Sequence, residues 1–246
     1  MKLFKLYLAF FAVSFAGVAS MAQTCNDFIL FQKGATYEME TYTGKGKKES
    51  RMEYIVKEVI KSEDKIESNI QSTSYNESDK TSNPTVINLK TICQNNKLFI
   101  DLTEAIKSMQ PSEMTKDMDI IVEGAMIEIP NKLTVGSTLP NLETKVRIVD
   151  KSSKSEIMAV DISTQNRKVI SSESVTTPAG TFQCFKIYQE QLIAPKMLMM
   201  NMALPKHTVV SNIYFSLKEI GMVKTEIMDH KGTEVKSYTI VTKYSK

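Results

Sequence analysis

The residues most able to do chemistry are four methionines within six positions of a segment that runs from Pro195 to His207. Thioethers and imidazole are soft ligands that suit Cu(I), so the methionines with His207 form one candidate copper site. Unbranched, polarizable side chains also repack around irregular apolar shapes, which favours a lid over a hydrophobic ligand. In the third interpretation, the four methionines only fill gaps between this segment and the sheet. The prolines at both ends predict a loop or a single helical turn between strands.

A second methionine cluster surrounds a short predicted helix. Leu102, Ile106 and Met109 are spaced as one helical face, and Pro111 ends it. If the two clusters meet, they line one apolar cavity. The candidate ligand-binding residues are therefore Met197, Met199, Met200, Met202, Met109 and Met118.

Catalytic machinery is sparse in this sequence. The two histidines, His207 and His230, lie in unrelated contexts, and there is no nucleophile elbow, zinc-protease helix, phosphate-binding glycine loop or dinucleotide fingerprint. Among 28 acidic residues nothing singles out a catalytic pair. We expect a protein that is not an enzyme, with no catalytic residues, no cofactor and no dedicated metal site. A formal charge of +3 is also too balanced for a nucleic-acid partner.

Residues 1–22 have the features of a cleaved signal peptide. Lys2 and Lys5 precede an apolar run over 6–18, and the segment ends in small residues that predict cleavage after Ala22. The destination is then the periplasm or the exterior, in the cell envelope. An uncleaved anchor is disfavoured because the apolar run is short. A lipoprotein acylated at Cys25 is the second alternative. It is less favoured, because a small residue should precede the acylated cysteine and Thr24 fits that position poorly.

Three cysteines remain after such cleavage, and an oxidising compartment permits one disulfide and one free thiol. We favour a disulfide between Cys25 and Cys93, because it would tie down the start of the mature chain. Cys184 then stays free and behaves as a small buried hydrophobe. A reactive Cys184 would need a nearby base that the local sequence does not offer.

Most of the chain alternates β-branched or aromatic residues with polar ones, which is the period of strands. We expect strands near 35–43, 51–60, 65–75, 85–93, 97–101, 142–149, 154–163, 166–176, 181–191, 207–217, 221–229 and 233–243, with a further strand signal from 120 onward. The prediction is a mostly all-β fold. It is a single large curved antiparallel sheet, or a β-roll or half-barrel, with one or two short helices. No linker divides the mature chain, so residues 23–246 form a single domain.

Three motifs carry a family resemblance: residues 176–187, the loop 130–140 and residues 221–226. In the first, Pro178 and Gly180 set a turn, and Phe182, Cys184 and Tyr188 are expected to line one face. With the early 25–28 segment, these motifs resemble a TapB-like, or domain of unknown function 3108-like, secreted protein family of Gram-negative bacteria. The resemblance spans nearly the whole mature chain and implies an envelope β-protein with no assigned activity. This chain lacks the tryptophan that such proteins often carry before the 221–226 turn.

The function expected from these observations is a non-enzymatic, exported envelope protein that binds a lipid or another apolar small molecule in a curved sheet. Two alternatives stay open. One is an envelope structural or assembly factor that contacts a protein partner through a strand edge. The other is a methionine-rich Cu(I)-binding protein. The sequence does not indicate an oligomeric state.

Overall fold

The computed structural model describes residues 28–77, 83–95, 97–108, 117–130, 132–217 and 220–246. The structure predicted from the alternating pattern is confirmed: these residues form a single antiparallel sheet of 14 strands with two short helices. The helices are a 3-10 turn at Ile29–Phe31 and α1 at Thr103–Ser108. The first-half strands are β1 Thr36–Thr43, β2 Lys48–Lys61, β3 Lys65–Asn76, β4 Thr85–Gln94, β5 Lys97–Asp101, β6 Met118–Glu123 and β7 Met126–Ile129. The others are β8 Leu142–Asp150, β9 Glu156–Thr177, β10 Gly180–Met197, β11 Met202–Ala203, β12 His207–Ser216, β13 Gly221–Met228 and β14 Val235–Ser245.

The strand order shows how the sheet curls. It runs β6-β8-β9-β10-β12-β13-β14-β1-β2-β3-β4-β5-β7, with β11 paired to β10, so β6 and β7 are its two edges. These edge strands are consecutive in the chain and are joined only by Gly124 and Ala125. Gly124 accepts a hydrogen bond from Thr144 of β8, and Ala125 accepts one from Leu102 after β5. The sheet must therefore roll until its two ends meet at this link.

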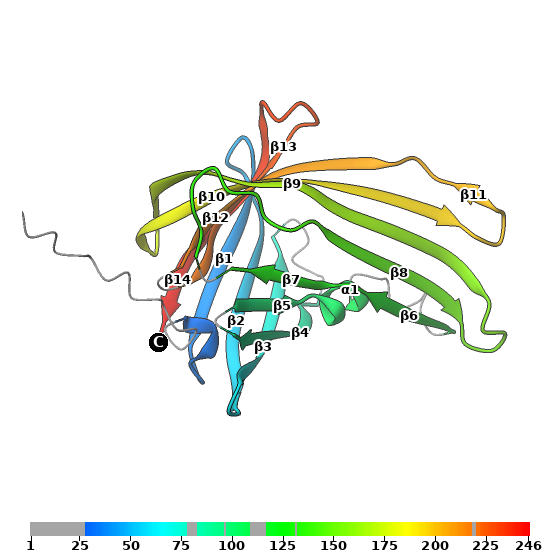
Figure 1. Ribbon diagram of the computed structural model, residues 1–246, viewed down its shortest axis with the longest axis horizontal. Coiled ribbons are helices and arrows are strands. Elements are labelled where there is room, and N and C mark those ends of the chain that lie inside the picture. Colours follow the sequence, from blue (N-terminus) through cyan, green and yellow to red (C-terminus); the bar gives the residue numbers. More distant parts are fainter. Residues whose placement is uncertain (1–27, 78–82, 96, 109–116, 131, 218–219) are drawn as a thin grey trace, which may run out of the picture.

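The rolled part, which we call the body, holds the core. It contains β1–β5, β7, β13 and β14 with the adjoining ends of β9, β10 and β12 (Figure 1). Apolar side chains from opposite walls bury one another inside it, including Met39, Val56, Ile70, Val169, Phe215 and Val241. The 3-10 turn contributes Ile29, which is fully buried and packs within this core.

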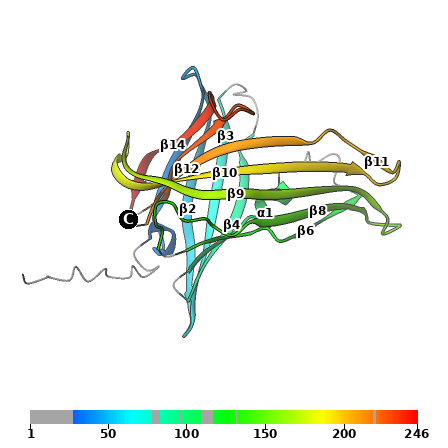
Figure 2. The ribbon, with the colours of Figure 1, turned by 45° about the horizontal axis from the view of Figure 1, so that its top comes forward.

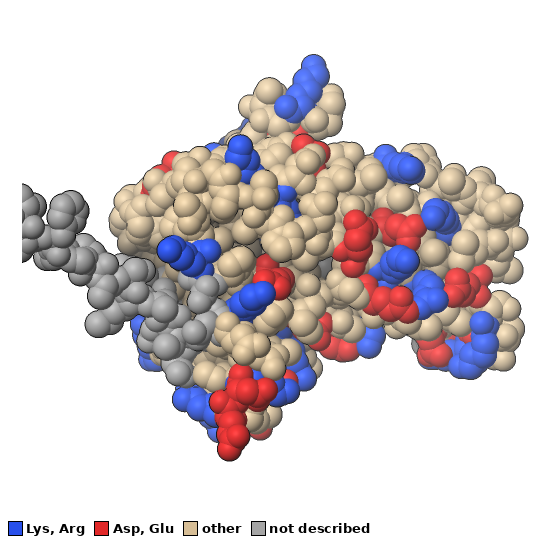
Figure 3. All heavy atoms as spheres, viewed as in Figure 1, with Lys and Arg blue, Asp and Glu red and all other residues tan. Residues whose placement is uncertain are grey.

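A long twisted ribbon, which we call the arm, projects from the body (Figures 1 and 2). It consists of β6, β8, β11 and the distal parts of β9, β10 and β12. Acidic and basic side chains mix on one of its faces, as Figure 3 shows. Ion pairs of the arm join Lys196 with Asp161 at 2.7 Å and Arg147 with Glu156 at 3.2 Å.

Several local predictions need correction. The two strands expected at 154–163 and 166–176 are one continuous strand, β9, because Asn166 forms a bulge at a φ of 54° and pairing with β10 resumes beyond it. The segment from Pro195 to His207 is only partly the loop that was predicted. Residues 195–197 continue β10, and Met202–Ala203 form β11, which pairs back on Lys196 and Met197 across a turn at 198–201.

The face expected for Phe182, Cys184 and Tyr188 is also partly wrong. Phe182 and Cys184 are buried, but a register shift between Lys186 and Ile187 changes which residues face inward. Ile187 continues the buried row, and the Tyr188 hydroxyl instead donates to Glu190 at 2.6 Å. The predicted short helix is confirmed as α1, although Met109 lies outside the described residues. No helix in the described part of the chain is long and apolar enough to cross a bilayer.

Candidate functional site

A cavity of about 330 Å³ lies inside the body, where the curled sheet leaves space between its walls. Its lining is predominantly apolar and comes from strands on all sides of the roll. Representative wall residues are Tyr54, Ile70, Leu89, Ile127, Ile187 and Ile213. The volume is at the lower end of the roughly 300–1,000 Å³ that small-molecule sites enclose. The body can therefore accommodate one small apolar ligand.

One part of the wall is polar, and it lies where the body joins the arm. Thr164 and Arg167 of β9 line the cavity together with Gln189 and Gln191 of β10. Thr164 and Gln191 are direct cross-strand partners. The cavity is thus amphipathic: this part of the wall carries hydroxyl, amide and guanidinium groups, and the remaining wall is mostly apolar, with Thr91 of β4 and two tyrosines as its polar members.

Arg167 is the unusual member of this polar group because it is only 4% exposed. One of its terminal nitrogens, Nη1, donates to the carbonyl oxygen of Pro140 at 2.7 Å, while its Nε has no hydrogen-bond partner. Burial lowers the pKa of the guanidinium, and the charge of Glu128 partly opposes that shift. Glu128 is itself ion-paired with Lys97 at 2.8 Å.

The bulge in β9 places Arg167 on the cavity side. Gln165 pairs with Glu190 and Lys168 pairs with Tyr188, so Asn166 and Arg167 together lie opposite the single residue Gln189. Strict alternation from the inward-facing Thr164 would put Asn166, not Arg167, on the inner face. Asparagine tolerates the required positive φ. The only sequence signal for this site was the break between the strands predicted to end at 163 and to start at 166.

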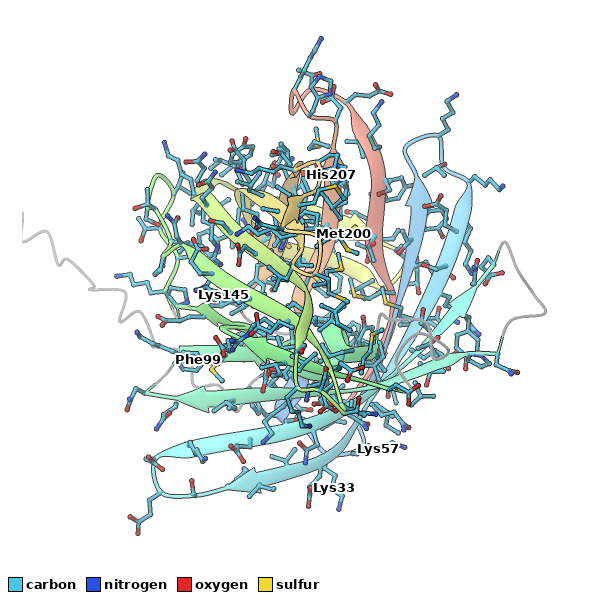
Figure 4. All side chains as sticks on the ribbon, turned by 90° about the vertical axis from the view of Figure 1, so that its right-hand side faces the viewer. Lys33, Lys57, Phe99, Lys145, Met200 and His207 are labelled. Atoms are coloured by element: carbon cyan, nitrogen blue, oxygen red, sulfur yellow. The ribbon has the colours of Figure 1, made fainter. Side chains whose placement is uncertain are left out.

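The candidate methionines among the described residues do not line the cavity. Met197 pairs with Met202 at the end of the arm, and Met199 and Met200 in the intervening turn are 74% and 70% exposed. Figure 4 looks along the arm and shows Met200 and His207 on its β10–β12 side, away from Lys145 of β8. Met118 begins β6 on the arm's edge, and Met109 lies outside the described residues. The methionines that line the cavity are Met39 and Met222, which the sequence did not single out.

The structure does not test the ligand roles of those arm methionines, so the copper and lid interpretations stay predictions. His207 and His230 are both exposed. Within the described ranges, no group of three or more histidine, cysteine or acidic side chains is placed to hold a metal ion.

Cys184 behaves as a buried hydrophobe should. It is free and fully buried, its Sγ donates to the carbonyl of Phe182 at 3.6 Å, and burial, aided by the charge of Glu173, raises its pKa to about 11. A thiol in that state is a poor nucleophile at neutral pH. Cys25 lies outside the described residues, so its pairing with Cys93 stays a prediction.

Comparison with known families decides the relationship suggested by the motifs. The model of the DUF3108-like family matches residues 32–241. The chain belongs to the DUF3108-like family. The match includes the polar end of the cavity and the whole arm. A comparison with curated proteins gives no significant match.

Two solved structures share this fold. One, from Parabacteroides distasonis ATCC 8503, is described as a candidate lipoprotein; it is 26% identical, with a TM-score of 0.66, and the alignment covers 91% of this chain and 100% of that one. The other, from Bacteroides fragilis NCTC 9343, is described as a candidate exported protein with a YmcC-like fold. It is 20% identical, with a TM-score of 0.60 and coverage of 87% and 97%. The second likeness supports the fold alone.

Proposed function

We propose that this DUF3108-like protein is an exported envelope protein that binds a lipid or other apolar small molecule inside its body and releases it unchanged. The observation that carries the proposal is the cavity of about 330 Å³ with its predominantly apolar wall. Concave apolar sites with a few converging polar groups are the usual form of small-molecule sites.

Export is supported by two independent features. Residues 1–22 have the charge and hydropathy pattern of a signal peptide. The solved relative from Parabacteroides distasonis is described as a candidate lipoprotein, and we extend that envelope location to this chain.

The chemistry of the lining supports binding over turnover. The polar groups that line the cavity are the hydroxyls of Thr91, Thr164 and tyrosines, the amides of Gln189 and Gln191, and the guanidinium of Arg167. Such groups donate and accept hydrogen bonds with little change of protonation near neutral pH. We therefore propose that the site orients its ligand and does not transform it.

A role in envelope assembly through protein contact is the second candidate, and the arm favours it. Alternation along the strands that carry Thr164 and Leu142 places partly exposed apolar side chains on the arm face continuous with the cavity. They include Ile120, Ile148, Met158, Val160 and Ile193. A contiguous exposed apolar surface commonly marks a contact with another protein or a lipid.

Two matched substitutions on one strand test the cavity. Leu89 of β4 lines the cavity, whereas Val86 of the same strand is 53% exposed on the other face. Leu89→Trp should fill the chamber and strongly weaken the binding of the fluorescent apolar probe N-phenyl-1-naphthylamine, while Val86→Trp should leave binding unchanged. Circular dichroism of both variants controls for folding. No probe binding by the natural protein, or equal binding by both variants, would refute the proposal.

A further inference from the structure

The geometry points to an anionic amphiphile as the ligand: a single acyl chain that ends in a carboxylate or a phosphate, with Arg167 as the head-group ligand. This inference rests on the proposed function and specifies the ligand class for the same cavity.

The first argument is charge. Arginine stays protonated in proteins, and a buried charge without a counter-charge is costly. Among the described residues no carboxylate forms an ion pair with Arg167; the acid that acts on it electrostatically, Glu128, is engaged by Lys97. A bound anion would supply the missing negative charge inside the cavity.

The second argument is hydrogen bonding. A guanidinium presents five N–H donors in a planar fork that matches two oxygens of a carboxylate or phosphate. The backbone oxygen of Pro140 takes one of these donors, and the Nε of Arg167 is buried without a partner. Buried donors are nearly always satisfied. The Nε of Arg147, on the outer face, also lacks a partner, so the argument rests on the place of Arg167 in the cavity lining and on the guanidinium donors that Pro140 leaves free. The amides of Gln189 and Gln191 line the same cavity and are available to a second head-group oxygen.

The third argument is that a specific backbone bulge sets the inward position of Arg167. The bulge at Asn166 is what turns Arg167 inward, and the Asn166 amide is fixed by a hydrogen bond to Glu190 at 2.8 Å. Bulges that re-aim one side chain are over-represented beside functional sites. An arginine needed only for surface charge would lie on the outer face, as Arg147 of β8 does with its partners Glu123 and Glu156.

The inner face of β9 then places the tail. From the arm toward the body, its inward-facing residues are Ile162, Thr164, Arg167 and Val169, so a short polar band separates two apolar surfaces. On the body side the apolar surface is enclosed, because Ile70, Leu89 and other wall residues form the cavity. A head group at Arg167 therefore directs its chain into the body. The cavity volume fits one chain more readily than the two of a phospholipid.

The alternative role of Arg167 is structural: its hydrogen bond to the carbonyl of Pro140 holds the loop before β8 in place. A purely structural arginine requires no ligand and gives the cavity no preference for an anion. The two roles therefore separate in a competition experiment.

The experiment displaces bound N-phenyl-1-naphthylamine with three ligands of equal chain length, below their micelle concentrations and at neutral pH. Dodecanoic acid and dodecyl phosphate carry the two candidate head groups, and dodecanol is the neutral control. For the natural protein we expect at least one anion to displace the probe at a concentration about tenfold or more below that of dodecanol, as a charge-assisted hydrogen bond requires. The more potent anion identifies the head group.

Arg167→Met should abolish that difference while dodecanol still competes, and the matched control Arg147→Met, on the outer face, should retain it. If the acid, the phosphate and the alcohol compete equally with the natural protein, the inference is overturned while the apolar site stands. Failure of the probe itself to bind would instead overturn the proposed function. Should Arg167→Met not fold, the comparison of anions with alcohol on the natural protein still decides the question.

Discussion

Replacing Arg167 with methionine should leave the protein as stable as before or make it more stable. The side chain is 4% exposed and makes one hydrogen bond, from Nη1 to the Pro140 carbonyl at 2.7 Å. Loss of a hydrogen bond to a charged group costs about 1.5–3 kcal/mol. Removing a buried ion relieves a desolvation penalty of several kcal/mol. Because methionine fills similar space with apolar atoms, we expect the free energy of unfolding to change by about 0 to +2 kcal/mol.

Urea unfolding of the mature protein, without added ligand, measures this change. An increase in the midpoint at constant m-value would report higher stability. Arg147→Met is the control, since its two ion pairs are partly exposed and should contribute no more than about 1 kcal/mol. A loss of more than about 2 kcal/mol in Arg167→Met would refute the reasoning, because it would show that the guanidinium supports the fold. Stability retained while anion binding is lost is the signature of a residue kept for binding.

Three further predictions concern the scaffold that positions the site. Gly124→Ala should lower the free energy of unfolding by more than about 1 kcal/mol in urea, because Gly124 has a φ of +72° and a Cβ there would clash with the backbone carbonyl of Glu143. Asn166→Val should cost about 1–2 kcal/mol in the same assay because of the positive φ at the bulge. Asn166→Gly should cost clearly less, because it loses the same exposed hydrogen bond to Glu190 but tolerates the positive φ; equal effects would contradict the bulge argument. Burial raises the pKa of Glu226, but hydrogen bonds from Lys224 and Tyr214 outweigh it, so the pKa is lowered overall. The charged carboxylate of Glu226 therefore stabilises the fold at pH values above its unfolded pKa, and this contribution is lost as the pH falls through its folded pKa. The melting temperature of Glu226→Gln should therefore fall less on acidification than that of the natural protein.

The strands could be predicted because their signal is local. Side chains that alternate between two faces leave a period of two in the sequence, and the expected 97–101 strand coincides with β5. The membership of one rolled sheet followed from the number of strands and the short connections between them. The sequence contained no repeat or linker that pointed elsewhere.

The site could not be predicted because its position depends on pairing between distant strands. In isolation Arg167 is one arginine in a polar stretch, and only the register of β9 against β10 turns it inward. The methionine segment illustrates a different point. Its ligand roles stay predictions, and Met199 and Met200 are exposed at the end of the arm, whereas the cavity is lined mainly by aliphatic residues contributed by many strands. Local composition can single out an unusual segment. A cavity, however, depends on which strands face one another in the folded sheet, and these strands are far apart in the sequence.

The inner face of the arm continues the cavity wall, and this continuity would constrain how the proposed ligand enters. The outer face of the arm carries ion pairs such as Lys196 with Asp161, which hold charge in water at little cost. Its inner face continues the apolar cavity wall past Arg167 through Ile162 and Val160. An amphiphile that approaches along this inner face keeps its chain on apolar surface until its head reaches the polar band. In the proposed binding mode, transfer into the body would exchange an open apolar contact for an enclosed one, while the head group would gain the buried guanidinium. The arm would thus lower the cost of desolvating the chain before the cavity receives it.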